Sequence, residues 1–263
     1  MIELVKAALR YRGFIVSSVV NEYKSRLTRS RFGTAWIVLQ PLAQVLIFAT
    51  ILSNVLAARL PGIDNKYAYA AYLMSGILCW SLFAEIVQRC MTVFIDNGSL
   101  LKKIQFPRIA LPMIVMGNAL VANLALLAVT LVALPALGIY PSALYVWLPL
   151  LMVLTVALAA GLGLLLGTLN VFARDVGQVV SVVLQFWFWI TPVVYPVSIV
   201  PERFIGAMAW NPVLPLVAGY QNVLIYDKPP PDGLVGVAVT SSIFLGVALL
   251  AFRRASAEMV DVL

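Results

Sequence analysis

Apolar segments long enough to cross a bilayer recur along the whole chain and are separated only by short polar stretches. Six can be marked from the pattern, at residues 35–57, 69–91, 109–134, 144–169, 176–195 and 234–252. About 20 mostly apolar residues are enough for a helix to cross the hydrocarbon layer. The sequence therefore predicts an all-α membrane protein with six transmembrane helices.

The composition leaves no room for a separate soluble domain. Of the 263 residues, 62% are hydrophobic and 11% are charged, whereas soluble domains carry about 25% charged residues. We therefore expect one transmembrane domain over residues 1–263. It divides into a leader at 1–34, a six-span bundle at 35–252 and a tail at 253–263.

The leader combines seven Lys and Arg residues with apolar residues at three- or four-residue steps, among them Tyr11, Ile15 and Val19. This period is typical of amphipathic helices that lie at a membrane surface, here with a break near Gly13. A signal peptide is the alternative, but the basic region is too long and the apolar core after it too short. We expect the leader to stay in the mature protein.

Two further segments are not predicted to cross the membrane, one because it is short and the other because prolines interrupt it. Residues 100–108 read Leu-Leu-Lys-Lys-Ile-Gln-Phe-Pro-Arg and predict a short amphipathic helix, capped by Asn97 or Ser99 and stopped by Pro107. Residues 196–225 are apolar but are interrupted by four prolines. This pattern predicts two short re-entrant helices in the outer membrane face, between the fifth and sixth spans.

The basic residues predict the orientation. With the N-terminus inside, 14 of the 18 Lys and Arg residues face the cytoplasm, and the other side receives only Arg59, Lys66, Arg203 and Lys228. Retention of basic residues on the cytoplasmic side therefore places both termini there, in a multi-pass protein of the cytoplasmic (inner) membrane. The same rule explains the net charge of +7 without a nucleic-acid partner.

Several kinds of chemistry lack their usual residues. The chain has no His, and its acids are scattered, which argues against a metal site, a bound cofactor or a hydrolytic site. Cys79 and Cys90 would lie about 16 Å apart along one helix, too far for a disulfide. No Gly-Lys pair is present for a phosphate-binding loop. If ATP drives this protein, a separate subunit must bind the ATP and its Mg²⁺.

Two features could line a passage, and each has a simpler interpretation. Glu85 is the one good candidate for a buried acid, but Arg89 one turn later predicts an intrahelical ion pair. Aromatic rings near a membrane surface most often form an interfacial belt, although some could stack on sugar faces. The candidate passage residues are Trp80, Phe83, Glu85, Phe186, Trp187 and Trp189.

A series of short motifs in a fixed order resembles a known family. They are Tyr11-Arg12, residues 22–26 (Glu-Tyr-Lys-Ser-Arg), 30–36 (Ser-Arg-Phe-Gly-Thr-Ala-Trp) and 40–42 (Gln-Pro-Leu), 72–77 (Tyr-Leu-Met-Ser-Gly-Ile) with Trp80, 106–108 (Phe-Pro-Arg) with Leu111-Pro112, Arg174-Asp175, Tyr195-Pro196, Pro201 and Asn211-Pro212. Their order and spacing are similar to those of the membrane subunits of ABC transporters that export lipid-linked polysaccharides such as O-antigens and teichoic acids.

The resemblance implies a homodimer that docks two ATP-binding subunits from the cytoplasm, with the leader as an interface helix. The residues that it implies for contact with the ATP-binding subunits are Lys102, Lys103, Phe106, Pro107, Arg108, Arg174 and Asp175. Those that it implies for an outer gate are Tyr195, Pro196, Pro201, Trp210, Asn211 and Pro212. Cys79 departs from the family pattern, in which proline is expected before the tryptophan, so a bend there is not predicted.

The expected function is ATP-driven export of a polysaccharide carried on a polyprenyl-diphosphate anchor, with no enzyme activity in this chain. A permease for a drug or lipid would have the same architecture and stays open as an alternative. An ion-coupled secondary transporter is less favoured because only one buried acid is available. A membrane-embedded transferase or phosphatase would need a cluster of acids or His at the surface.

Overall fold

The computed structural model describes residues 10–29, 35–47, 50–51, 60, 63–103, 107–256 and 258–259. Regular structure within these ranges is helical, as the apolar pattern predicts. Four helices are long and apolar enough to cross a membrane: α4 (Ala68–Asp96), α6 (Ala110–Ala136), α7 (Leu148–Phe172, preceded by the 3₁₀ turn η2, Ala143–Trp147) and α11 (Leu234–Ala255). Their bounds lie within about five residues of the predicted spans.

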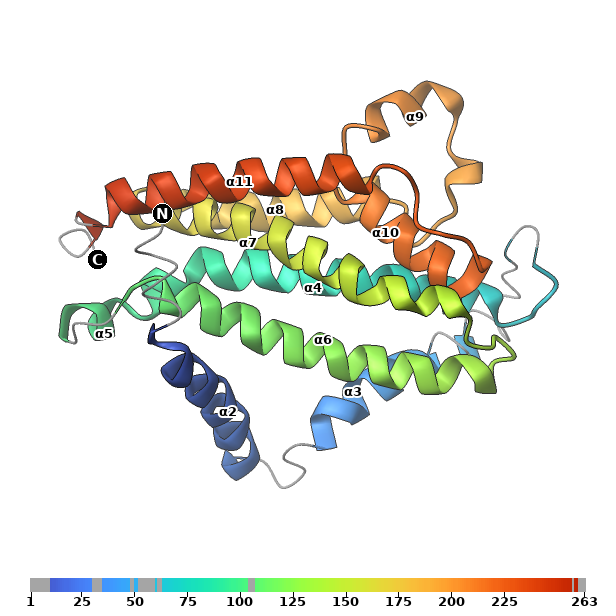
Figure 1. Cartoon of the computed structure of the whole chain (residues 1–263), viewed down its shortest axis with the longest axis horizontal. Helices are drawn as coiled ribbons and strands as arrows, with labels where there is room; N and C mark the ends of the chain where they lie inside the picture. The colour runs from blue at the N-terminus through green and yellow to red at the C-terminus, as the bar shows by residue number, and fades with distance from the viewer. Residues whose placement is uncertain are drawn as a thin grey trace.

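These four helices run side by side along the long axis of the molecule (Figure 1). α7 packs between α11 and α4, and α4 in turn packs against α6. The end of α4 lies beside the ends of α7 and α11, because Asn170 donates to the carbonyl of Met91 at 3.0 Å and Phe94 stacks on Phe252. We call this end of the bundle the α5 end, and the opposite one the α10 end.

Glycines allow α7 to approach its neighbours closely. A Cβ added at Gly163 would lie 2.8 Å from the Cβ of Cys90, and one added at Gly167 would collide with the Cys90 carbonyl oxygen. A Cβ at Gly161 would lie 2.8 Å from the backbone nitrogen of Leu245 in α11. Side chains at these positions would separate the helices, so the glycines fix the centre of the bundle. Both cysteines are buried there and unbonded.

Within the described part of the leader, residues 10–29, the long helix is α2 (Arg12–Arg29), which begins one residue before Gly13 and packs on α6. α3 (Ala35–Ile47) follows and also packs on α6. The rest of the predicted first span, residues 48–49 and 52–57, lies outside the described residues.

α8 (Asp175–Ile190) covers most of the predicted fifth span but ends five residues earlier than predicted. The cause is Pro192, because a proline disfavours the helical conformation of the residue before it. Thr191 is extended, with ψ 132°. The helix has 16 residues and is about 24 Å long, shorter than the hydrocarbon layer of about 30 Å.

The short helix after α4 is α5 (Gly98–Lys103). The sequence predicts Asn97 or Ser99 as the cap of this helix. The Nδ2 of Asn97 donates to the Val93 carbonyl at 2.8 Å, which closes the end of α4. A carbonyl at a helix C-terminus has no intrahelical partner, and this contact supplies one.

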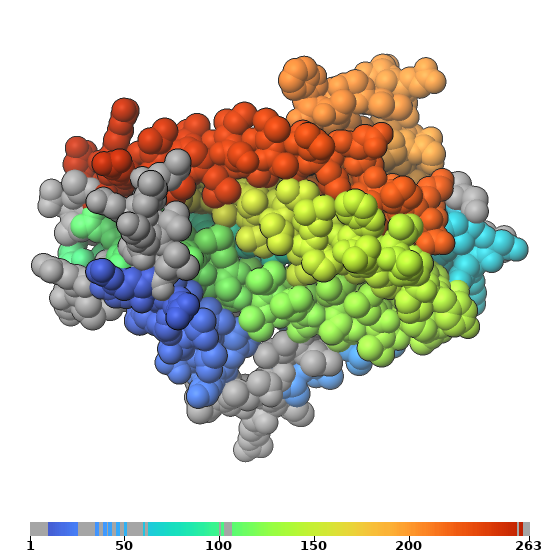
Figure 2. Space-filling view, viewed as in Figure 1, coloured from blue at the N-terminus to red at the C-terminus, as the bar shows by residue number. Residues whose placement is uncertain are grey.

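Four short elements follow α8 at the α10 end: η3 (Val197–Ile199), α9 (Glu202–Met208), α10 (Leu214–Gln221) and the π-helical turn η4 (Asn222–Tyr226). α10 packs on α4 and α7, whereas α9 projects from the body of the protein (Figure 2). The segment leaves and returns beside Tyr72, whose hydroxyl donates to the Tyr195 carbonyl and whose ring contacts Tyr226.

Candidate functional site

The aromatic residues predicted to line a passage fall into two groups. Trp80 and Phe83 of α4 are buried and pack on Trp187 of α8, with ring centroids 6.5 and 5.3 Å from the Trp187 ring. Phe186 and Trp189 lie on the outer side of α8 and are 67% and 63% exposed. The first group therefore holds α8 against α4, and the second group is available to lipid, to another chain or to a substrate.

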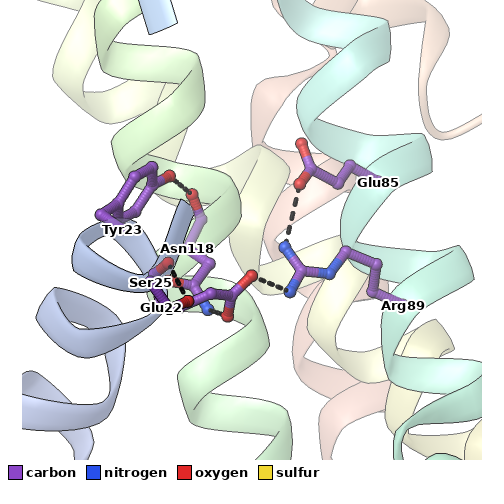
Figure 3. Close-up of polar contacts among 6 residues, drawn as sticks. All are labelled: Glu22, Tyr23, Ser25, Glu85, Arg89 and Asn118. Atoms are coloured by element: carbon purple, nitrogen blue, oxygen red, sulfur yellow. Dashed lines mark hydrogen bonds and ion pairs between the residues drawn. The ribbon is translucent and has the colours of Figure 1, made fainter. Parts of the chain in front are cut away.

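Glu85 forms the predicted ion pair with Arg89 of the same helix, with Arg89 Nη1 3.2 Å from Glu85 Oε1. The structure adds a second carboxylate from the leader, because Arg89 Nη2 lies 3.0 Å from Glu22 Oε1 (Figure 3). A paired acid at this position gives no support to an ion-coupled mechanism.

Asn118 of α6 completes this cluster. Its Nδ2 donates to the other oxygen of Glu22, and its backbone carbonyl accepts a hydrogen bond of 2.8 Å from the Tyr23 hydroxyl (Figure 3). Three helices, α2, α4 and α6, thus meet through polar contacts of Glu22, Tyr23, Glu85, Arg89 and Asn118, which we call the three-helix cluster. The sequence could suggest Glu85 with Arg89, but nothing in its spacing links Glu22 to a residue 67 positions away.

A cavity of about 480 Å³ lies beside the three-helix cluster, between α2, the last two turns of α4 and the first turns of α6. Arg89 and Glu22 line it together with Thr92, Asp96 and Asn97. Phe14 of α2 and Leu111 of α6 provide apolar wall. The cavity thus combines charged, hydrogen-bonding and apolar surface at the α5 end.

The segment after α8, Thr191–Tyr195, is held from several sides, and we call it the anchored segment. The Tyr69 hydroxyl donates to the Val194 carbonyl at 2.6 Å, and Gln221 Nε2 donates to the Pro192 carbonyl at 3.1 Å. The Tyr72 hydroxyl reaches the carbonyls of Pro192 and Tyr195 at 3.3 and 3.0 Å. Tyr69 and Tyr72 stand out in the sequence as aromatic residues, but their backbone acceptors are 120 or more residues away.

Asn211 joins the anchored segment to α8 and α10. Its Oδ1 accepts from Trp187 Nε1 at 2.9 Å and from the Val213 backbone nitrogen at 3.0 Å, while its Nδ2 donates to Thr191 Oγ1 at 2.8 Å. The side chain is 9% exposed. An asparagine that uses both ends of its amide in this way fixes the chain where it turns back toward the bundle.

Some of the residues predicted for an outer gate take part in the hydrogen bonds of the anchored segment. Others lie in the projecting segment around α9. Tyr195 and Asn211 take part in the hydrogen bonds, and burial raises the pKa of the Tyr195 hydroxyl. Pro196 and Pro212 are half-buried beside them. Pro201 is exposed at the start of α9, and Trp210 after it is 89% exposed.

The residues predicted to contact ATP-binding subunits lie at the α5 end, where the structure describes them. Lys102 is exposed on α5, and Pro107 and Arg108 are half-buried before α6. Arg174 and Asp175 are exposed at the start of α8. The side chain of Lys103 and all of Phe106 lie outside the described residues. Asn170 fixes the turn before α8 to α4, since its Oδ1 accepts from the Gly177 backbone nitrogen at 2.9 Å and its Nδ2 bonds α4.

The chain is similar in sequence to several known proteins. Residues 15–225 match the model of the ABC-2 type transporter family. The chain is 29% identical to the O-antigen export system permease protein RfbA of Myxococcus xanthus over 99% of each chain. It is 26% identical to a protein of the same name from Klebsiella pneumoniae over 92% of each. A polysialic acid transport protein, KpsM of Escherichia coli, is 22% identical over 75% of this chain and 76% of its own length.

Proposed function

Because this chain belongs to the ABC-2 type transporter family, we propose that it is the membrane subunit of an ATP-driven exporter that moves a polysaccharide on a polyprenyl-diphosphate anchor across the cytoplasmic membrane. The observation that carries this proposal is the similarity to an O-antigen export permease over 99% of both chains. The relative named for polysialic acid supports the same substrate class. These similarities do not favour drug or lipid export.

The proposed complex contains two copies of this chain and two ATP-binding subunits, which bind ATP and Mg²⁺. α5 and the turn before α8 form the surface for those subunits, with Lys102, Arg174 and Asp175 exposed on it. The exposed apolar side of α8, with Phe186 and Trp189, is a candidate for the second copy or the passage. Trp80, Phe83 and Trp187 then support that side from behind.

The proposed topology has six spans with both termini in the cytoplasm, so that the α5 end faces inward. α3 begins the first span and α8 forms the fifth. The segment from η3 to η4 is then re-entrant at the outer face, in agreement with the contacts of both its ends with Tyr72. α9 and Trp210 would lie at the outer membrane surface, where exposed aromatic rings are common.

Deletion of the chain in its own host tests the function. Cells without it should accumulate polyprenyl-linked polysaccharide inside and lose it from the surface, and expression of the wild-type chain should restore export. Lys102→Glu should reduce both export and co-purification with the ATP-binding subunit, whereas Lys66→Glu at the outer end should leave co-purification unchanged. Normal surface polysaccharide in the deletion strain would contradict the proposal.

Single cysteines test the topology. Ser198→Cys and Asp232→Cys, each in a chain with Cys79 and Cys90 replaced by Ala, should both react with a membrane-impermeant thiol reagent on intact cells. Labelling at position 198 alone, with position 232 reached only after the membrane is opened, would rule out the re-entrant segment and the six-span arrangement.

A further inference from the structure

The side chain of Asn170 holds three helices together at the α5 end. Asn170 lies in the last turn of α7 and is 3% exposed. Its Nδ2 donates to the Met91 carbonyl in the last two turns of α4 at 3.0 Å, and its Oδ1 accepts from the Gly177 backbone nitrogen in the first turn of α8 at 2.9 Å. Both ends of one buried amide are thus used between helices.

These two contacts add links between helices and do not complete ordinary helix bonding. The Met91 carbonyl lies inside α4, where each carbonyl accepts from the residue four positions ahead. The Gly177 N–H is in the first turn of α8, where such groups have no partner four residues back, and its other acceptor is the Arg174 carbonyl at 3.3 Å. A Cβ at Gly177 would lie 3.1 Å from Asn170 Oδ1, so the glycine lets α8 approach the amide.

α5 takes its position from the end of α4, because a single residue separates the two helices (Figure 1). That residue, Asn97, is bonded to both of them. Its backbone nitrogen donates to the Val93 carbonyl at 3.2 Å, and its carbonyl accepts from the Leu101 nitrogen at 3.0 Å. A displacement of α5, which carries the exposed Lys102, is therefore passed to the part of α4 that Asn170 holds.

The turn between α7 and α8 is as short. Two residues, Ala173 and Arg174, separate Phe172 at the end of α7 from Asp175 at the start of α8. Asn170 holds this turn on both sides, since it belongs to α7 and bonds the first turn of α8. The turn, with Arg174 and Asp175 exposed on it, therefore cannot shift against α4 unless a contact of Asn170 breaks.

We propose that Asn170 is a positioning residue for the coupling of ATP hydrolysis to export. It joins α5 and the α7–α8 turn into one unit, so that the ATP-binding subunits move the end of α4 and the start of α8 together. This inference rests on the proposed function of those two surfaces. Asn170 is buried and acts through its backbone partners, and tightly packed interiors transmit such displacements. The movement then reaches the exposed apolar side of α8, with Phe186 and Trp189.

Transport per ATP tests the coupling. The complex with its ATP-binding subunits is reconstituted in vesicles with polyprenyl-diphosphate-linked polysaccharide extracted from the host. Asn170→Ala should lower the polysaccharide moved per ATP hydrolysed by about fivefold or more, while the subunits still co-purify. Thr168→Val is the matched control and should keep the wild-type ratio, because Thr168 is equally buried, at 2% exposed, but bonds the Leu164 carbonyl of its own helix.

Gly177→Ala disturbs the same contact from the other side. Its Cβ pushes on the Asn170 amide, so this variant should also lower the ratio, by about two- to fivefold. In the double variant with Asn170→Ala the amide is gone and the new Cβ has room. The double variant should therefore be no worse than Asn170→Ala alone, as expected for two changes that remove one interaction.

Spin labels test the joint movement without any polysaccharide. Ser99→Cys on α5 and Ala173→Cys in the turn are both exposed, and they are labelled in a chain with Cys79 and Cys90 replaced by Ala. The labelled chain is diluted into unlabelled copies and assembled with the ATP-binding subunits. With the native Asn170, the distance should be the same before and after addition of ATP and vanadate. In Asn170→Ala it should broaden or shift.

Three results would overturn the proposal: a wild-type transport ratio in Asn170→Ala, an equal loss in Thr168→Val, or a label distance that Asn170→Ala leaves unchanged. If Asn170→Ala does not assemble, Gly177→Ala replaces it in both experiments, and a wild-type ratio and distance in that variant would overturn the proposal. Failure of the wild-type complex to move polysaccharide would contradict the proposed function alone, since the label distances do not depend on the substrate.

Discussion

The polar contacts that hold the anchored segment at the α10 end are neutral and mostly directed at backbone carbonyls, whereas the contact that joins α2 to α4 toward the α5 end is a half-exposed ion pair between side chains. Asn211 and Tyr72 represent the first kind, and Glu22 with Arg89 the second. Both sets join segments that are distant in the sequence. They differ in what breaks them.

This difference assigns different tasks to the two ends. A buried donor or acceptor that loses its partner costs about 1–3 kcal/mol, so the anchored segment is held in one position. A half-exposed ion pair contributes about 0.2–1 kcal/mol and weakens with salt. We therefore expect α2 to separate from α4 at little cost and the anchored segment to keep its position.

Removal of the Asn211 side chain should have the largest effect on this contrast. Asn211→Ala leaves Trp187 Nε1 and the Val213 backbone nitrogen without their acceptor, at about 1–3 kcal/mol for each. The melting temperature of the purified protein should fall clearly. Asn222→Ala is the control, since that side chain makes one 3.3 Å contact at the surface. Equal melting temperatures would mean that the anchored segment is not held by Asn211.

Gly76 tests the same end through packing. A Cβ there would lie 2.8 Å from the Val193 carbonyl oxygen and 3.0 Å from Gln221 Nε2, so Gly76→Ala should push the anchored segment away and cost about 1–3 kcal/mol. Gly246→Ala on α11 meets nothing within 4 Å and should not destabilise. Thermal melting of the two variants side by side measures the difference, and an unaffected Gly76→Ala would show that the segment can shift freely.

Salt should affect the α5 end by a smaller amount. Trypsin cleavage after Lys24 in α2 should become about 1.5- to 5-fold faster between about 0.05 and 0.5 M NaCl, as the Glu22–Arg89 pair is screened. Cleavage after Arg203 in α9 is the internal control and should keep its rate. In Glu22→Gln the salt dependence at Lys24 should disappear. A salt effect that survives this substitution would place the attachment of α2 elsewhere.

The smallest expected effect is that of pH on the α10 end. Asn211, Trp187 and Gln221 do not titrate, and burial raises the pKa of Tyr195 above its usual value near 10. A raised pKa means that the neutral hydroxyl is favoured in the fold, so its contribution is complete below about pH 10 and is lost as the pH rises through the raised pKa. The melting temperature of Glu22→Gln should thus stay flat between about pH 6 and 9. A transition in that range would mean that a further titrating group contributes to the stability of the fold.

The sequence predicts the long helices well because each is apolar over most of its length, and the start of the last span at Leu234 is placed to the residue. It also predicts Glu85 with Arg89, since the spacing of four residues puts them on one helix face. It does not predict Glu22 with Arg89 or Tyr69 with Val194, because helix packing alone brings these pairs together. Composition likewise cannot separate Trp187, which packs inward, from Trp189, which points outward.

The C-terminus of α8 at Ile190 could have been predicted from the sequence. The apolar run continues to Tyr195 and favours a longer helix, but Pro192 forces Thr191 out of the helical conformation. The effect of the proline outweighs hydropathy here. The backbone carbonyls after Ile190 accept hydrogen bonds from the side chains of Tyr69, Tyr72 and Gln221 and so do not need helical partners.

Distances between spin labels during the ATP cycle test the contrast between the two ends most directly. One label pair joins Val16 of α2 to Gln88 of α4, and the other joins Ile190 at the end of α8 to Val146 of η2; all four side chains are exposed. The labelled chain, without Cys79 and Cys90, is diluted into unlabelled copies and assembled with the ATP-binding subunits. Addition of ATP and vanadate should shift or broaden the first distance and leave the second unchanged. A shift of the second distance with the first unchanged would contradict the account.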